Sequence, residues 1–364
     1  MGKRVNTATW SDKYNRWQIN VQKDGKRRSF YSSTPGRTGQ REANAKADAW
    51  LDNGLSLTGE RVQAAYSEYQ EECKGTFSKT EYNHVDSIGR IWIVPRLGKK
   101  KVTDLCDGDI QKLLDEAAAL GRSRKTIQDI NGMINKFLKW CRRNKKTLYR
   151  PDDVHIPASA RLKGKTILQP DDLIKLLTVD TTIYKGKRIK EEYIHAYRFQ
   201  VLTGLRPGEL RGLRVEDIDG ERVYIRRSIN VFGEETKGKN QNAIRSFVMS
   251  DLAMNEIEAQ FREYPSKDGF VFPLPSPTTY RERWQKYCES NDITKTSAYE
   301  LRHTFVSVIK TLPAGEVKQL VGHSHNMDTF GVYGHKINGE DTRTAQKIND
   351  LFQSVMTLEE AVKK

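Results

Sequence analysis

Cysteine is scarce in this sequence, and the cysteines present are not placed to form a site. The four residues, Cys73, Cys106, Cys141 and Cys288, lie far apart, with no Cys-x-x-Cys pair and no cysteine–histidine spacing typical of zinc. A small domain held by disulfides would need a denser set of cysteines, and so would a structural zinc site. The sequence therefore predicts neither disulfides nor a structural metal.

Long hydrophobic runs are also missing. No apolar stretch approaches the roughly 18 residues that a membrane span requires, and the N-terminus lacks the hydrophobic segment of a signal peptide. We expect a protein that stays in the cytoplasm and has no membrane partner. Its 364 residues are enough for two or three domains, each with its own core.

Acidic residues are the minority among the charged ones. Against 62 Lys and Arg stand 47 Asp and Glu, so the formal net charge is +15. Such a surplus favours a polyanionic partner, bound with an affinity that falls steeply with salt. Basic charge alone also fits ribosomal or RNA-binding proteins, so the function has to be read from the motifs.

Four motifs toward the C-terminal end combine arginine, histidine and tyrosine. They are TGLRPGEL from Thr203, YELRHTF from Tyr299, LVGHSH from Leu320 and FGVYGH from Phe330. Arginine offers a charged fork for phosphate oxygens, histidine donates a proton or a hydrogen bond near neutral pH, and tyrosine can be a covalent nucleophile. Each motif alone has an ordinary explanation, such as a helix C-cap or core packing, but four in this order are far more specific.

In type and order these motifs resemble the signature boxes of the tyrosine recombinases, in particular the integrases of prophages and integrative conjugative elements. The resemblance implies a site-specific DNA recombinase that cleaves and rejoins DNA through a covalent 3′-phosphotyrosine, integrating and excising a mobile element. The implied partners are double-stranded DNA with core and arm attachment sites, further copies in a homo-tetramer, and an excisionase or DNA-bending helper.

The same resemblance implies a role for each motif residue. Tyr333 would attack the scissile phosphate, and Arg206 and Arg302 would bind its two non-bridging oxygens. His323 would hydrogen-bond the phosphate or assist proton transfer. Because the arginines stabilise the charge, the reaction would need no metal ion and no other cofactor.

Two further positions of the implied site are less regular. The family carries a general-acid lysine on a hairpin, and counting back from Arg245 favours Lys239 while leaving Lys237 open. Tyr299 stands where the family more often has histidine. A phenol can donate a hydrogen bond to phosphate but is a poor base near pH 7.

Residues 1–55 resemble a small α+β arm-type DNA-binding domain. Residues 1–50 hold 11 Lys and Arg against 4 Asp and Glu, a surplus of 11 − 4 = 7. Apolar and polar residues alternate over 17–22, Asp24-Gly25 is a hairpin turn signal, and residues 43–51 have an apolar helical face. The alternative is a basic solvated hairpin. On its open face we expect the DNA-binding residues Lys26, Arg27 and Arg28.

Residues 56–148 resemble the all-α core-binding domain of the family. We expect helices over 58–73, 78–92, 107–118 and 123–143, the last with an apolar stripe from Ile127 to Leu138. Its polar surface either contacts DNA or is an ordinary solvated face. The candidate contacts are Arg124, Lys125, Lys139 and Arg142.

A linker over 149–165 is expected to lead into a mainly α (α+β) catalytic domain, residues 166–364. Its expected elements are a helix that begins near Pro170, a helix over 194–202 that ends at Gly204, strands over 222–231 and 243–249, and a helix that begins at a Ser297–Glu300 capping box. An apolar stripe within 342–364 predicts a tail helix. It would pack either on its own domain or, as in the family, on a neighbouring subunit.

Three other interpretations are compatible with parts of this pattern. A type IB topoisomerase-like enzyme and a resolvase-type tyrosine recombinase share the chemistry, but neither explains the N-terminal sheet domain. A catalytically silent DNA-binding regulator of the same fold would have no need of all four of Arg206, Arg302, His323 and Tyr333.

Overall fold

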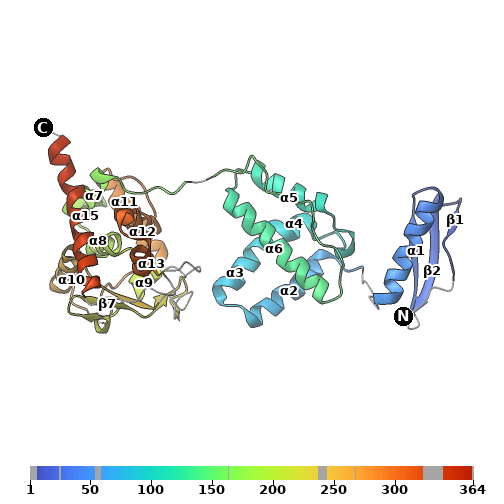
Figure 1. Ribbon diagram of the computed structural model, residues 1–364, viewed down its shortest axis with the longest axis horizontal. Coiled ribbons are helices and arrows are strands. Elements are labelled where there is room, and N and C mark those ends of the chain that lie inside the picture. Colours follow the sequence, from blue (N-terminus) through green and yellow to red (C-terminus); the bar gives the residue numbers. More distant parts are fainter. Residues whose placement is uncertain are drawn as a thin grey trace. The chain divides into compact units, whose positions relative to one another are not determined.

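The computed structural model of the chain divides into two compact units, residues 1–163 and 164–364. Figure 1 shows their helices and strands. The described residues form three separate hydrophobic clusters, two in the first unit and one in the second. No helix among the described residues is long and apolar enough to cross a membrane. The structure describes residues 6–23, 26–53, 59–162, 164–236, 244–266, 268–322 and 339–362.

A small sheet backed by one helix forms the N-terminal part. Its strands β1 (Thr9–Ser11), β2 (Arg16–Lys23) and β3 (Lys26–Ser32) are antiparallel in the order β1-β2-β3, and α1 (Gly36–Asn53) covers one face. Ile19 on β2 packs against α1, whose small and apolar residues are buried there. The predicted hairpin and helix are confirmed, and β1 is an additional strand that the pattern did not reveal.

The strand register corrects one expectation about this sheet. Val21, which is buried under α1, pairs with Arg28, so the two side chains share the helix-covered face. The Arg28 guanidinium lies 5.6 Å from the Phe30 ring on that face. Arg27 pairs with Gln22 and stands on the open face. The basic run is therefore split between the two faces, because successive strand residues point in opposite directions.

Helices contribute most of the second hydrophobic cluster, and Leu105 and Ala160 join it from connecting segments. All six apolar residues of the predicted stripe on α6 are buried, which confirms that helix as a core element. The helix that was expected to begin at residue 58 begins at Val62. The elements are α2 (Val62–Thr76), α3 (Lys79–Ile88), a π-helical turn η1 (Gly89–Ile93), α4 (Val94–Leu97), a 3-10 turn η2 (Val102–Asp104), α5 (Asp107–Ala119) and α6 (Arg124–Arg143).

The helix expected over 78–92 is interrupted by the π-helical turn at Gly89. A Cβ at this position would lie 2.1 Å from Cε1 of Tyr66, so only glycine allows α2 and this turn to approach so closely. The irregular segment after α6 is held against the same helices. The Tyr149 hydroxyl donates to Asp107 at 2.6 Å, and the Arg124 amide donates to the Arg161 carbonyl at 2.8 Å. Much of the stretch expected as a linker is thus attached to the helical part.

Helix α8 is the centre of the second unit. Every residue from Ile194 to Thr203 is buried, and Figure 1 shows α8 among the other helices. The helix is therefore enclosed on all sides, and its polar side chains need partners inside the unit: Arg198, for example, donates to the Leu176 carbonyl at 2.7 Å. The helices of this unit are α7 (Pro170–Thr178), α8 (Ile194–Thr203), α9 (Pro207–Gly212), α10 (Asp251–Glu263), α11 (Pro277–Ser290), α12 (Ala298–Val308), α13 (Ala314–Val321) and α15 (Glu340–Val362), with 3-10 turns η3 (Val215–Asp217) and η5 (Ile309–Thr311).

The predicted strand pair exists, but it is interrupted. Ile225 pairs with Arg245 and Ser228 pairs with Thr236, so 2 residues separate these pairs on the outgoing side and 8 on the returning side. A ladder cannot continue across unequal lengths, and the hairpin divides into two. The strands are β6 (Ile218–Asp219), β7 (Arg222–Ile225) and β10 (Arg245–Val248) in the order β10-β7-β6, β8 (Ser228–Ile229) with β9 (Glu235–Thr236), and an unpredicted hairpin of β4 (Thr181–Tyr184) with β5 (Lys187–Lys190).

The tail helix α15 packs on its own unit. Ile348 and Phe352 belong to the same hydrophobic cluster as α8, and the Phe352 and Phe305 ring centroids are 6.3 Å apart. Arg222 on β7 also pairs with Asp341 at 2.8 Å. Of the two arrangements left open by the sequence, the structure has the one within the chain.

Candidate active site

The turn between α8 and α9 places Arg206. Gly204 ends α8 with φ = 65°, and a Cβ there would lie 2.3 Å from Cδ1 of Phe305, so conformation and space both require glycine. Pro207 begins α9 and restricts the residue before it to extended backbone. Arg206 is that residue, with φ = −67° and ψ = 147°. The sequence TGLRPGEL thus forms a tight corner with an arginine at its tip.

Arg302 reaches the same corner from α12, whose start is the predicted capping box between Ser297 and Glu300. Its side chain is buried, and its two terminal nitrogens donate to the Gly204 carbonyl at 2.7 Å and the Val321 carbonyl at 2.6 Å. Burial, assisted by the charge of Arg206, lowers the pKa of Arg302 to about 10. The guanidinium therefore lies in a site where its positive charge is poorly solvated.

The two arginines converge on one point of the chain. Arg206 donates from Nη2 to the Gly322 carbonyl at 3.2 Å, while Arg302 donates to the carbonyl of the preceding residue, Val321. These carbonyls lie at the C-terminal end of α13, which Gly322 terminates with φ = 62°. The next residue in the sequence is His323. The fold thus brings two of the motif arginines to the start of the histidine motif.

A third arginine and a carboxylate complete the cluster. Arg245 pairs with Glu209 at 2.9 Å and donates from Nε to the Leu320 carbonyl at 2.8 Å, and Arg206 pairs with the other oxygen of Glu209 at 2.7 Å. Burial alone would raise the pKa of Glu209, but hydrogen bonds and charge from Arg245 and Arg206 lower it below its ordinary value. Three arginines and one carboxylate leave a net charge of 3 − 1 = +2.

Sequence reasoning missed the contribution of Arg245 and Glu209 to this site. Arg245 served only as a reference point for locating a lysine, and Glu209 was read as part of a motif. The sequence did contain a signal for Arg245. It is a basic residue on the strand that follows the segment 237–243, called the lysine segment below because it carries Lys237 and Lys239, and it can face the same site. What it lacked was the pairing partner, which comes from α9.

Tyr299 and Arg302 are three residues apart on α12, as expected, but they differ in exposure. Arg302 is buried, whereas Tyr299 is 44% exposed. The Tyr299 ring lies against the His303 ring, with centroids 5.3 Å apart. Burial lowers the pKa of His303, assisted by the charge of Lys165, so this imidazole is disfavoured as a cation. Tyr299 therefore faces solvent beside the arginine site.

Four predicted residues lie outside the described part of the chain, namely Lys237, Lys239, His323 and Tyr333. Among the residues that the structure describes, no group of three or more His, Cys, Asp or Glu side chains could hold a metal ion. The arginine cluster, in contrast, has the charge and the forked donors that bind a phosphate.

The basic residues proposed for DNA contact on α6 differ in their surroundings. Lys139 is exposed, and Lys125 is exposed but pairs with Asp129 at 2.7 Å one turn later. Arg142 donates to the Tyr149 carbonyl at 2.9 Å, so it also holds the segment that follows α6. Arg124 is half-buried at the start of the helix. Lys26 pairs through its backbone with Lys23 in the N-terminal sheet.

Comparison with known proteins finds integrases and recombinases. Residues 166–339 match the sequence model of the phage integrase family. The chain is 24% identical to a tyrosine recombinase XerC-like protein of Caldanaerobacter subterraneus subsp. tengcongensis, over 97% of this chain and 100% of that protein. It is 26% identical to the ICEBs1 integrase of Bacillus subtilis, over 70% of this chain and 72% of the integrase.

Solved structures share the fold. The Tn1549 transposon integrase, in complex with transposon right end DNA, superposes with a TM-score of 0.62 at 19% identity, over 78% of this chain and 98% of that chain. A lambda integrase tetramer bound to a Holliday junction gives a TM-score of 0.57 at 13% identity, over 93% of this chain and 99% of that one.

The chain has the multidomain fold of these integrases, with a small N-terminal sheet and a mainly helical second unit. Residues 166–339 form a phage integrase domain, and the chain is a tyrosine recombinase, an enzyme that cleaves and rejoins DNA. The resemblance found in the four motifs is thereby confirmed.

Proposed function

We propose that this tyrosine recombinase integrates and excises a mobile element through a covalent 3′-phosphotyrosine intermediate. The observation that carries the proposal is the convergence of Arg206 and Arg302 on the carbonyls of Val321 and Gly322, immediately before His323. With Arg245 and Glu209 the cluster has a net charge of +2, and in this proposal the arginines stabilise charge in place of a metal ion. A scissile phosphodiester has one negative charge and two non-bridging oxygens, which two guanidinium forks can bind.

In the proposed reaction the Tyr333 oxygen attacks phosphorus. A new O–P bond forms, the bond from phosphorus to the 5′-oxygen breaks, and the electron pair of that bond goes to the 5′-oxygen. Lys239 gives this oxygen a proton and becomes a neutral amine, while the phenol proton leaves to solvent or to a neighbouring base. Arg206 and Arg302 stabilise the charge on the non-bridging oxygens, and His323 donates to the phosphate.

Reversal of the same steps rejoins the strand. Attack by a 5′-hydroxyl on the phosphotyrosine restores a phosphodiester and frees Tyr333. Since the covalent bond keeps the phosphodiester energy, no nucleotide hydrolysis is required. Tyr299 is 44% exposed, and in this proposal its hydroxyl donates a hydrogen bond to phosphate rather than acting as a base.

The remaining parts of the chain bind DNA in this proposal. Residues 1–55 bind arm-type sites, residues 56–148 bind the core site, residues 149–165 link the two DNA-binding domains to the catalytic domain, and residues 166–364 perform the chemistry. The relatives support these partners, since the Tn1549 integrase was solved with transposon right end DNA and the lambda integrase as a tetramer on a Holliday junction. We propose the same homo-tetramer on DNA, with an excisionase or DNA-bending helper for excision.

The test is covalent capture of DNA. A nicked duplex with the element's end sequence should become linked to the protein through Tyr333, in excess EDTA as well as with magnesium. The Tyr333→Phe variant should bind the duplex but form no adduct. Peptide mapping of the adduct identifies the linked residue. Linkage at another residue, equal trapping by the Phe variant, or strict dependence on magnesium would refute the proposal, and tight binding without any adduct would indicate a silent regulator.

A further inference from the structure

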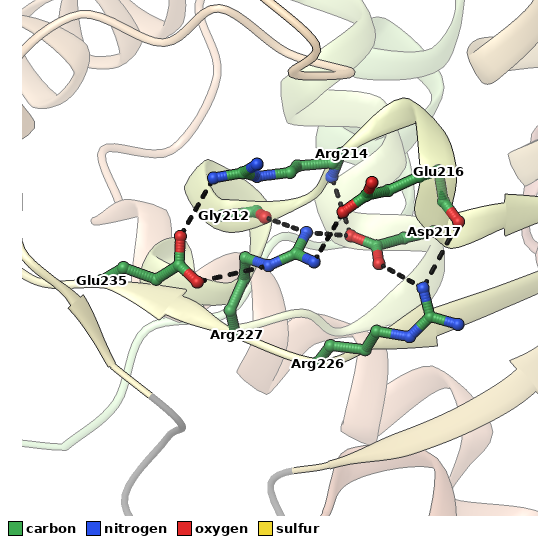
Figure 2. A network of polar contacts seen from close by, with 7 residues as sticks. All are labelled: Gly212, Arg214, Glu216, Asp217, Arg226, Arg227 and Glu235. Carbon is green, nitrogen blue, oxygen red and sulfur yellow. Dashed lines mark hydrogen bonds and ion pairs between the residues drawn. The ribbon is translucent and has the colours of Figure 1, made fainter.

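A buried carboxylate organises a network of ion pairs beside the arginine site. Asp217 is 1% exposed and lies at the end of the 3-10 turn η3. It pairs with Arg227 at 2.6 Å and with Arg226 at 3.1 Å, and it accepts from the Arg214 amide at 2.9 Å (Figure 2). The side chains named in this paragraph, with Glu216 and Glu235, are called the Asp217 network below.

The network holds the start of strand β9. Glu235, the first residue of β9, pairs with Arg214 at 3.1 Å and lies 3.6 Å from Arg227 (Figure 2). Arg227 directly precedes β8, the partner of β9, so its guanidinium links the residue before one strand of this two-stranded ribbon to Glu235 on the other. In the sequence, Lys237 follows Glu235 by two residues and Lys239 by four.

The β8–β9 ribbon also packs against α9, the helix that directly follows Arg206. A Cβ on Gly208 would lie 2.4 Å from Oγ of Ser228, and a Cβ on Gly212 would lie 3.2 Å from Cγ of Arg227. The two glycines of α9 therefore let β8 and the Asp217 network approach the helix backbone. The C-terminal side of the lysine segment is fixed to the same helix, because Arg245 pairs with Glu209 on α9. Both flanks of residues 237–243 are thus fixed to the element that presents Arg206.

We propose that Asp217, Arg227 and Glu235 are positioning residues for the protonation of the leaving 5′-oxygen. This inference rests on the proposed function, in which a lysine of the segment 237–243 is the general acid. The Asp217 network fixes Glu235, which precedes this segment by two residues, relative to the helix that follows Arg206. A general acid acts only within hydrogen-bond reach of the leaving oxygen, so the placement of the flank sets the rate of the protonation step.

Chemistry allows this step to be examined separately. With a normal substrate the 5′-oxygen must take a proton as its bond to phosphorus breaks. If that oxygen is replaced by sulfur, the electron pair stays on sulfur, because a thiol has a pKa of about 8.5 and leaves readily as its anion. A defect confined to the general acid therefore slows the oxygen substrate and spares the sulfur substrate.

The experiment measures the rate of adduct formation by the full-length protein on two nicked DNAs that differ only in this atom. Glu235→Lys reverses the charge at a half-exposed site, and Glu258→Lys, on the exposed side of α10, makes the same charge change as a matched control. Glu235→Lys should slow the oxygen DNA by about 10- to 100-fold and the sulfur DNA by less than about threefold. Glu258→Lys should stay within about twofold on both. Asp217→Asn, tested if it folds, should show the Glu235→Lys pattern.

Each other result has a definite meaning. Equal slowing of both DNAs by Glu235→Lys would show that the Asp217 network only stabilises the unit, and it would overturn the inference while the proposed function stands. An unchanged rate on the oxygen DNA would overturn it as well. If the wild-type protein forms no adduct on either DNA, or if Lys237→Ala and Lys239→Ala both cleave the oxygen DNA normally, the proposed function itself fails and the inference fails with it.

Discussion

Neutralising Glu209 should destabilise the catalytic unit strongly, because this carboxylate balances the charge of the arginine site. Glu209 is 3% exposed and pairs with Arg206 at 2.7 Å and Arg245 at 2.9 Å. At an effective dielectric constant of about 20, each pair with charges about 4 Å apart is worth about 4 kcal/mol, part of which offsets desolvation. Removing one partner of a buried pair costs about 3–5 kcal/mol. We expect this loss in the free energy of unfolding for Glu209→Gln.

The measurement has to report on this unit alone, since the chain has three hydrophobic clusters and need not unfold in one step. Trp284 is the only tryptophan in residues 164–364 and is fully buried. The ¹⁹F resonance of fluorotryptophan at this position therefore follows its unfolding in urea. Glu216→Gln is the matched control, because that side chain is 63% exposed and its pair with Arg227 should contribute less than about 1 kcal/mol.

The difference should also depend on pH. The pKa of Glu209 is lowered in the folded chain from an ordinary value of 4.5, so its charge stabilises the fold fully above that value. This stabilisation is lost as the pH falls through the folded pKa. The gap between wild type and Glu209→Gln should be widest above about pH 5 and should narrow below 4.5. A loss below about 1 kcal/mol, or one no larger than that of Glu216→Gln, would refute the reasoning.

Three more outcomes are expected. Gly204→Ala should lower the free energy of unfolding by about 3 kcal/mol or more, because the new Cβ would overlap the Phe305 ring. Gly220→Ala is the control: its φ is 54° and no atom lies near its Cβ, so it should lose only about 1 kcal/mol, and similar losses for the two variants would contradict the overlap argument. In single-turnover measurements of DNA cleavage, Tyr299→Phe should raise the barrier by about 1–2 kcal/mol and Arg302→Ala by much more. An equal increase in the barrier for both variants would show that the phenol has a larger role than hydrogen-bond donation. Deleting residues 1–54 should leave suicide-substrate cleavage largely intact but remove the DNase footprints at outlying sites of the element. Identical footprints for the full-length and the truncated protein would show that these residues are only a solvated basic hairpin.

Local sequence patterns determined most of the elements. The apolar stripe of α6, the end of α8 at Gly204 and the capping box of α12 were all predictable, because they depend on residues a few positions apart in the chain. The four motifs indicated the family for a related reason, because the residue types that bind a phosphate and the order of the motifs can be read directly from the sequence. The identity of Arg206 and Arg302 as site candidates needed no structure.

Tertiary structure alone decided what these residues touch. Register placed Arg28 on the covered face of the N-terminal sheet, and the return of β10 beside α9 brought Arg245 to Glu209. Packing of Phe352 against Phe305 put α15 on its own unit. The physical reason is the same in each case. Propensity, capping and periodicity act over a few residues, whereas ion pairs and burial join segments that are distant in sequence, and their partners are set only when the chain has folded.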